Sequence, residues 1–186
     1  LDQILAECPG AASKLLAWSA ASSTGEEAYS LAITISEHLA KQAGPKPDWL
    51  VYASDISSKA IKVATTAIYQ EASLNLPQPQ FLQRYFKRGR DIYESKCRVK
   101  PEILDHVKIE RINLFQETYP LPAQLHLIFC RNVLIYFAQD SQSQLVSRLH
   151  RMLTPGGFLV IGHCDSLACF KHDFQSLGGG VYRKSS

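Results

Sequence analysis

The chain has 186 residues, a formal net charge of +3, 46% apolar residues and 20% charged residues. This length suits one compact domain with a small insert, and the globular composition excludes a largely disordered chain. The weak positive charge alone does not argue for a nucleic-acid partner, and no apolar run approaches the roughly 18 to 20 residues that a membrane span needs. The start of the chain has no signal-peptide core and no initiator methionine, so we expect a fragment of a longer cytoplasmic protein, by default a monomer.

The first half of the chain alternates apolar runs with helical patterns. The elements expected there are a helical or irregular lead-in, a buried strand, a helix, a second strand and a second helix, at residues 1–14, 15–20, 23–44, 49–54 and 57–67. Ser23 and Glu26 have the spacing of a capping box, which predicts that the first long helix begins there. Ser57 is the expected N-cap of the second helix.

The second half continues this alternation after a basic stretch at residues 84–100. The elements expected beyond it are strands at 107–111 and 125–130, a helix at 140–152, a strand at 158–161 after a Pro155-Gly156-Gly157 turn, and a hairpin of 170–175 with 181–184. The alternation of strands and helices implies a mostly parallel sheet that is covered on both faces. Such sheets bind ligands at the carboxyl ends of their strands, so we look for chemistry there.

The loop after the first strand is rich in small residues and ends in two carboxylates. Residues 20–27 read AASSTGEE, with one glycine where a dinucleotide site would want G-x-G-x-x-G. The negative charges of Glu26 and Glu27 repel a phosphate and favour a cationic ligand group. The alternative is that both carboxylates only stabilise the N-terminus of the following helix.

Polar residues also follow the second and third strands. Asp55 stands where a carboxylate commonly accepts hydrogen bonds from both ribose hydroxyls of an adenosine, although an Asx-turn or a helix cap would explain it as well. Asn113, followed by Leu114, would read the edge of an adenine while the leucine packs on its face. An ordinary turn is the alternative for this pair.

The fourth strand ends in Cys130, Arg131 and Asn132, an unusual sequence because arginine is seldom buried without a partner. We favour a functional role for Arg131, with a structural ion pair to Glu26 or Glu27 as the alternative. Tyr136 is either a packed core aromatic or a functional hydroxyl.

The cysteines and histidines predict neither a disulfide framework nor a metal site. The five cysteines are odd in number and contain no C-x-x-C pair, and the six histidines show no H-x-x-x-H spacing. We therefore expect free thiols and no metal.

Six strings stand in order along nearly the whole chain: WSAASSTGEEAYS at 18–30, ASDIS at 53–57, RYF at 84–86, NL at 113–114, IFCRNVLIYF at 128–137 and PGGFLVIGH at 155–163. Together they resemble the chemotaxis receptor methyltransferases, the CheR-type protein-glutamate O-methyltransferases. The resemblance implies an α/β, class I S-adenosylmethionine (SAM)-dependent, Rossmann-like fold. Such a fold has a doubly wound seven-stranded sheet with one antiparallel strand near its edge and a small β insert, here at 84–111.

The resemblance also implies a site. The expected cofactor-binding residues are Ala20, Ala21, Glu26, Asp55, Asn113, Leu114, Cys130, Arg131 and Asn132. Arg131 and Tyr136 are the expected catalytic residues, which position either the cofactor carboxylate or the incoming glutamate. The insert is expected to dock a receptor tether peptide, and its basic residues at 84–100 would suit glutamate-rich receptor helices. The alternative is that this basic stretch is a solvated, mobile surface loop.

The sequence departs from the family in several places. From the resemblance we expect that this chain lacks the helical N-terminal domain that the family usually carries. Ser22 stands where Cys is frequent, and Ala28 stands where Pro is frequent. The string GHCDS at 162–166, which contains Asp165, replaces the usual Gly-His-Ser-Glu-Ser. These departures remove none of the cofactor contacts that the resemblance implies.

The implied reaction is methyl transfer from SAM to receptor glutamate carboxylates. Its competitors are a methyltransferase that acts on nucleic acid or a small molecule, a SAM-binding scaffold without turnover, and a nicotinamide dehydrogenase. The missing G-x-G-x-x-G and the acidic first loop disfavour the dehydrogenase.

Overall fold

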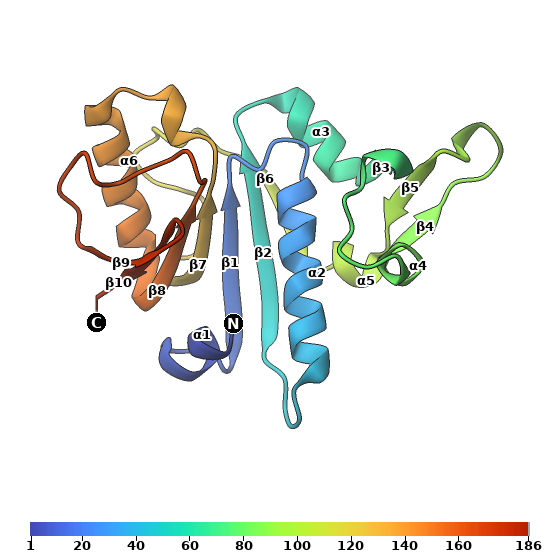
Figure 1. Cartoon of the computed structure of the whole chain (residues 1–186), viewed down its shortest axis with the longest axis horizontal. Coiled ribbons are helices and arrows are strands. Elements are labelled where there is room, and N and C mark those ends of the chain that lie inside the picture. The colour runs from blue at the N-terminus through green and yellow to red at the C-terminus, as the bar shows by residue number, and fades with distance from the viewer. Residues whose placement is uncertain (186) are drawn as a thin grey trace.

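The computed structural model describes residues 1–185, which form one large sheet, a small sheet and their covering helices (Figure 1). The strands of the large sheet, in spatial order, are β6 (Val107–Arg111), β2 (Asp48–Asp55), β1 (Lys14–Ala20), β7 (Leu125–Cys130), β8 (Leu153–Ile161), β10 (Val181–Lys184) and β9 (Phe174–Gly178). Of the seven strands, β10 alone runs antiparallel to the other six. The expected doubly wound seven-stranded sheet, with one antiparallel strand beside its edge, is therefore confirmed.

Six α-helices and three short 3₁₀ segments connect the strands within the described residues. The helices are α1 (Asp2–Glu7), α2 (Glu26–Lys41), α3 (Ser58–Thr66), α4 (Gln80–Tyr85), α5 (Pro101–Leu104) and α6 (Gln139–Met152). The 3₁₀ segments are η1 (Glu71–Ser73), η2 (Asp91–Tyr93) and η3 (Leu134–Tyr136). None of the helices in this part of the chain combines the length and apolarity that a bilayer crossing requires.

Two hydrophobic cores lie on opposite faces of the large sheet. Because successive strand residues point to opposite faces, Leu15 and Ala17 of β1 pack with the buried face of α2, whereas Trp18 packs with Leu145 and Leu149 of α6. The buried positions of α2 recur at helical spacing: Ala28, Leu31, Ala32, Ile35 and Leu39. Helices α2 and α6 thus cover opposite faces of the sheet and leave the carboxyl ends of the central strands open.

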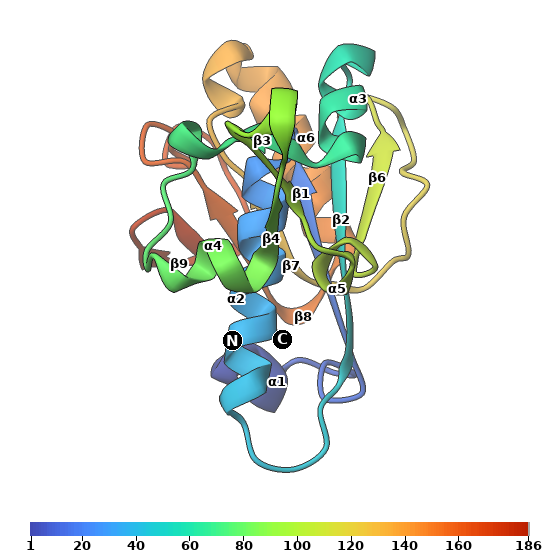
Figure 2. The ribbon, with the colours of Figure 1, turned by 90° about the vertical axis from the view of Figure 1, so that its right-hand side faces the viewer.

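The small sheet is a separate unit that projects beyond α3 and α5 (Figure 1). It consists of β3 (Ile68–Gln70), β5 (Lys96–Val99) and β4 (Phe86–Arg88), all paired antiparallel. Helix α4 lies beside α2 (Figure 2). It anchors the small sheet to α2, because Arg84 and the Tyr85 hydroxyl both bind the Glu37 carboxylate.

The expected limits of the insert, 84–111, are corrected at both ends. At the start, β3 already belongs to the small sheet, since Ile68 pairs with Arg98. At the end, β6 pairs with β2 in the large sheet. A pairing between strands about 30 residues apart leaves no local signal in the sequence.

Two local expectations are also wrong. The capping box does not form: α2 begins at Glu26 with Gly25 as its N-cap, at φ +96°, and no side chain caps it. The Glu26 carboxylate instead accepts the Thr24 hydroxyl at 2.6 Å. Strand β8 begins at Leu153, before the expected turn, and absorbs Pro155-Gly156-Gly157 as an irregularity, since Leu125 pairs with Leu153 and Leu127 with Phe158.

Gly25 offers a stability test, because it is held in a left-handed conformation against α3. A Cβ at this position would lie 3.0 Å from the Ala64 Cβ, whereas a Cβ on Gly44, which has a similar φ of +92°, would meet nothing within 4 Å. We expect Gly25→Ala to lower the free energy of unfolding by about 2 to 4 kcal/mol, from backbone strain plus the clash. The matched Gly44→Ala variant carries the backbone strain alone, about 1 to 2 kcal/mol. Equal losses in urea denaturation would contradict the clash.

Candidate active site

The candidate site lies where the strand order reverses. The chain proceeds outward from β1 through β2 to β6 on one side, and through β7 to β8 on the other. The loops that follow β1 and β7 therefore diverge from two adjacent strands, which creates the crevice at which open α/β sheets bind ligands.

The loop after β1 is fixed by backbone contacts to the next strand. The Ser22 amide donates to the Ser54 carbonyl at 2.7 Å, and Ala21 and Ser23 both adopt positive φ values, 57° and 49°. The buried Tyr69 hydroxyl donates to the Thr24 carbonyl at 2.8 Å, and burial raises the pKa of this phenol, so it stays protonated as a donor. The small residues and fixed turn let a ligand approach the backbone closely.

Asp55 joins two of the loops that border the crevice. Its carboxylate accepts the Ser23 amide at 3.0 Å and the Ser57 amide at 2.8 Å. The second of these bonds is the Asx-turn that the sequence left open. Each oxygen keeps a further lone pair, so the same carboxylate also remains able to accept hydroxyl groups of a ligand.

A cavity of about 250 Å³ opens beside Asp55. Its lining residues are Ala21, Asp55, Ile56, Ile112, Asn113, Leu114, Phe115, Val133 and Phe137. Phe115 and Phe137 meet edge to face, with ring centroids 4.7 Å apart. The walls are mainly apolar with a carboxylate and an amide among them, which is the composition that suits a nucleoside.

The residues after β6 shape one wall of this cavity. The Asn113 side-chain oxygen accepts the Phe115 amide at 3.0 Å, so it forms the ordinary turn that was the alternative interpretation, while its amide nitrogen stays available. The Leu114 carbonyl accepts the Tyr119 hydroxyl at 2.6 Å, and burial raises the pKa of Tyr119 to about 12. Tyr119 in turn packs on Trp18, which ties this wall to the core.

Arg131 forms the structural ion pair that the sequence left open. Its guanidinium lies 3.2 Å from the Glu27 carboxylate, and the other oxygen of Glu27 accepts the Ser19 hydroxyl at 2.7 Å. The partner is therefore Glu27 and not Glu26, which is exposed and bound to Thr24. The arginine side chain is 36% exposed, and the remaining guanidinium donors can bind an anion.

The other expected residues divide between the interior and the surface. Ala20 and Cys130 are fully buried, and burial together with the nearby Asp165 and Glu27 charges raises the pKa of the Cys130 thiol, which makes it a poor nucleophile. Asn132 is exposed and has a φ of +56°. Tyr136 is 77% exposed, so the interpretation as a packed core aromatic is wrong.

The cavity thus brings together Ala21, Asp55, Asn113 and Leu114 of the expected set, and the other expected residues do not line it. Sequence reasoning missed five lining residues, namely Ile56, Ile112, Phe115, Val133 and Phe137. Ile112 and Phe115 flank the recognised Asn113-Leu114 pair, and the apolar character of a nucleoside site was the signal that would have found them. Among residues 1–185, no three His, Cys, Asp or Glu side chains are grouped so as to hold a metal ion.

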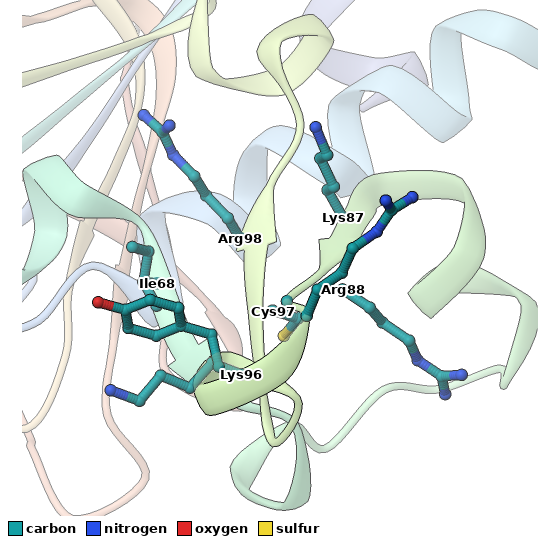
Figure 3. A pocket seen from close by; sticks show the side chains of 9 residues that line it. Ile68, Lys87, Arg88, Lys96, Cys97 and Arg98 are labelled. Atoms are coloured by element: carbon teal, nitrogen blue, oxygen red, sulfur yellow. The ribbon is translucent and has the colours of Figure 1, made fainter.

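A second hollow, of about 510 Å³, lies on the small sheet (Figure 3). Lys87 pairs directly opposite Arg98, which in turn pairs with Ile68 of β3, so two cations face each other across neighbouring strands. Such like-charge pairs are unfavourable without an anion. Arg88 is bound to Glu71 at 2.6 Å, but no ion pair to Lys87, Arg90 or Arg98 occurs in the described part of the chain.

Comparison with known proteins identifies the family to which this chain belongs. The sequence pattern of the family "CheR methyltransferase, SAM binding domain" matches residues 2–183. The chain belongs to this family. The resemblance inferred from the sequence is therefore confirmed, and S-adenosylmethionine is the cofactor for which this domain is built.

Relatives with curated names support the same conclusion. The chain is 39% identical over 168 residues to the chemotaxis protein methyltransferase of Salmonella typhimurium, covering 90% of this chain and 57% of that protein. It is 36% identical over 165 residues to chemotaxis protein methyltransferase 2 of Pseudomonas aeruginosa, covering 89% and 58%. The chain thus spans less than two thirds of the length of these relatives.

The residues present fit the cofactor. The apolar cavity between Leu114 and Phe137 suits a purine, and Asp55 lies at its border with free lone pairs for ribose hydroxyls. The amides of the first turn of α2 have no side-chain cap, and Arg131 has spare donors for a carboxylate. An adenosine and an amino-acid end therefore find complementary groups along one crevice.

Asp55 gives a direct test of this assignment. We expect Asp55→Asn to weaken binding of S-adenosylhomocysteine by roughly 10- to 100-fold in calorimetry, because a hydrogen bond to a charged group contributes about 1.5 to 3 kcal/mol. Asp48→Asn is the matched control: it removes the same charge from the opposite end of the same strand, where the side chain is exposed. Equal affinities of the two variants would remove Asp55 from the cofactor site.

Proposed function

We propose that this chain catalyses methyl transfer from S-adenosylmethionine to glutamate side-chain carboxylates of chemotaxis receptors. The family match over residues 2–183 is the observation that carries the proposal. The names of the relatives support chemotaxis as the setting. The chemistry of the crevice supports glutamate as the acceptor, as follows.

The carboxylates of Glu27 and Asp55 in the crevice already accept hydrogen bonds from groups of the protein. Glu27 is engaged by Ser19 and Arg131, and Asp55 is engaged by two backbone amides. A glutamate with a pKa near 4.3 is already ionised at neutral pH and needs no general base. A carboxylate acceptor therefore suits the residues that are present.

The protein contributes alignment in this proposal. The bound cofactor supplies a methyl group on a positively charged sulfur. Arg131 holds a carboxylate, either of the cofactor or of the acceptor, with its donors that Glu27 leaves free. Tyr136 presents its hydroxyl from an exposed position to orient the acceptor. Holding two reactants in line contributes roughly 7 to 11 kcal/mol to such reactions.

The small sheet supplies the docking surface for the receptor in this proposal. Lys87 and Arg98 face outward on adjacent strands, Lys96 and Arg90 border the same hollow, and Ile68 adds an apolar contact (Figure 3). An acidic receptor segment, such as a tether peptide, would relieve the repulsion between the paired cations.

The decisive experiment uses the intact protein with methyl-labelled S-adenosylmethionine and receptor cytoplasmic fragments. A glutamate methyl ester releases labelled methanol in mild alkali, whereas N-methyl groups do not. We expect alkali-labile label on the receptor. Stable label would indicate a different acceptor, and cofactor binding without any transfer would support the scaffold alternative.

Charge reversal on the small sheet tests receptor docking. We expect Lys87→Glu and Arg98→Glu each to weaken receptor binding on the order of tenfold at low salt, with the difference shrinking at high salt because ions screen exposed charges. Lys46→Glu is the control, since this exposed lysine lies in the loop between α2 and β2 and makes the same net charge change. Identical losses in all three variants would show that only net charge matters.

A further inference from the structure

A buried carboxylate beyond β8 binds the loop that follows β7. Asp165 is 8% exposed, and its Oδ2 accepts the amides of Asn132 at 2.8 Å and Gly162 at 3.0 Å. Its Oδ1 accepts the Ile135 amide at 3.2 Å. Burial of a charge is unfavourable unless hydrogen bonds compensate it, and these three backbone donors provide that compensation.

The same loop is held from its other side by α6. The Gln142 side-chain amide donates to the Leu134 carbonyl at 3.0 Å and to the Phe137 carbonyl at 2.9 Å. Residues 131–138, which we call the η3 loop, are therefore bound through their amides by Asp165 and through their carbonyls by Gln142. The two binding side chains come from different elements: Gln142 lies in α6, and Asp165 lies in the segment after β8.

This double attachment determines which side chains of the η3 loop point inward. Leu134 is buried in the core, and Phe137 packs on Phe115 in the cofactor cavity. Between them, Ile135 and Tyr136 are 49% and 77% exposed. The exposure of two large side chains follows from a backbone held on both sides, since collapse onto the core would break these hydrogen bonds.

The residues that attach the η3 loop are also tightly packed against one another. A Cβ on Gly162 would lie 2.8 Å from both the Asn132 nitrogen and the Asp165 Oδ2. Asn132 itself adopts a φ of +56°, a strained backbone conformation that persists only where the surroundings fix it. The end of β8, the carboxylate and the start of the η3 loop are thus in direct contact.

We propose that Asp165 and Gln142 are positioning residues of the reaction, which hold the η3 loop so that the Tyr136 hydroxyl faces the methyl acceptor. This inference rests on the proposed function. Neither side chain touches a reactant: both act through the backbone of the loop. Because a small misplacement of an aligning group slows a reaction strongly, loosening either attachment reduces turnover.

A double-mutant cycle in the intact protein tests the proposal. We expect Asp165→Asn and Gln142→Ala each to lower kcat/KM for the receptor by roughly 10- to 100-fold. In a Tyr136→Phe background the same substitutions should cost no more than about threefold, because the group that they position is already gone. Asp140→Asn is the control: it removes an exposed carboxylate from the first turn of α6 and should leave kcat/KM unchanged.

Amide hydrogen exchange provides a readout that needs no turnover. In Asp165→Asn, exchange at Asn132 and Ile135 should accelerate while the amides of β1 and β7 stay protected. If Asp165→Asn fails to fold, the Gln142→Ala cycle decides the proposal alone, since this side chain is only half-buried.

Fully additive losses with Tyr136→Phe, or an unchanged kcat/KM in folded variants, would overturn the positioning role. Absence of methyl transfer by the wild type would instead contradict the proposed function. In that case, unchanged amide exchange in Asp165→Asn would refute the attachment itself.

Discussion

The reversal of strand order at β1 is the constraint on which the rest of the molecule depends. β1 pairs with β2 on one side and with β7 on the other, and α2 and α6 cover opposite faces of the sheet. Neither helix covers the carboxyl ends of the central strands. The loops that begin there lack the backbone partners that strands provide, and buried backbone groups need partners. Side chains from neighbouring elements provide these hydrogen-bond partners, and the loops that they hold border the candidate active site.

Two aspartates solve this problem in the same way. Asp55 binds the loop after β1 through the Ser23 amide, and Asp165 binds the loop after β7 through the amides of Asn132 and Ile135. Each carboxylate lies at the end of a strand next to the one whose loop it holds. Hydrogen bonds to an ionised acceptor are the stronger kind, so both loops are fixed before any ligand binds. A pre-formed crevice then loses less entropy when it orders its reactants.

The sequence predicted the large sheet well, because its signals are local. The limits of β6 and β7 match the expected strands, and Ser57 caps α3 as expected, by accepting the Ala60 amide. Interactions between distant segments could not be predicted from the sequence. The pairing of Ile68 with Arg98, the choice of Glu27 as the partner of Arg131 and the attachment of the η3 loop by Asp165 all depend on the folded topology. The capping box failed for a local reason, since Gly25 with its left-handed backbone leaves Ser23 too early in the chain to cap α2.

The η3 loop receives support from both faces of the sheet. Arg131 is held by Glu27, which belongs to α2 on one face, whereas Leu134 and Phe137 are held by Gln142, which belongs to α6 on the other. Neighbouring residues of the η3 loop are therefore supported by helices on opposite faces of the sheet. Packing changes near α2 should first disturb the Arg131 guanidinium, and changes near α6 should first disturb the exposed Tyr136. The fold thus separates the support of a charge from the support of a hydroxyl, although the two groups stand only five residues apart.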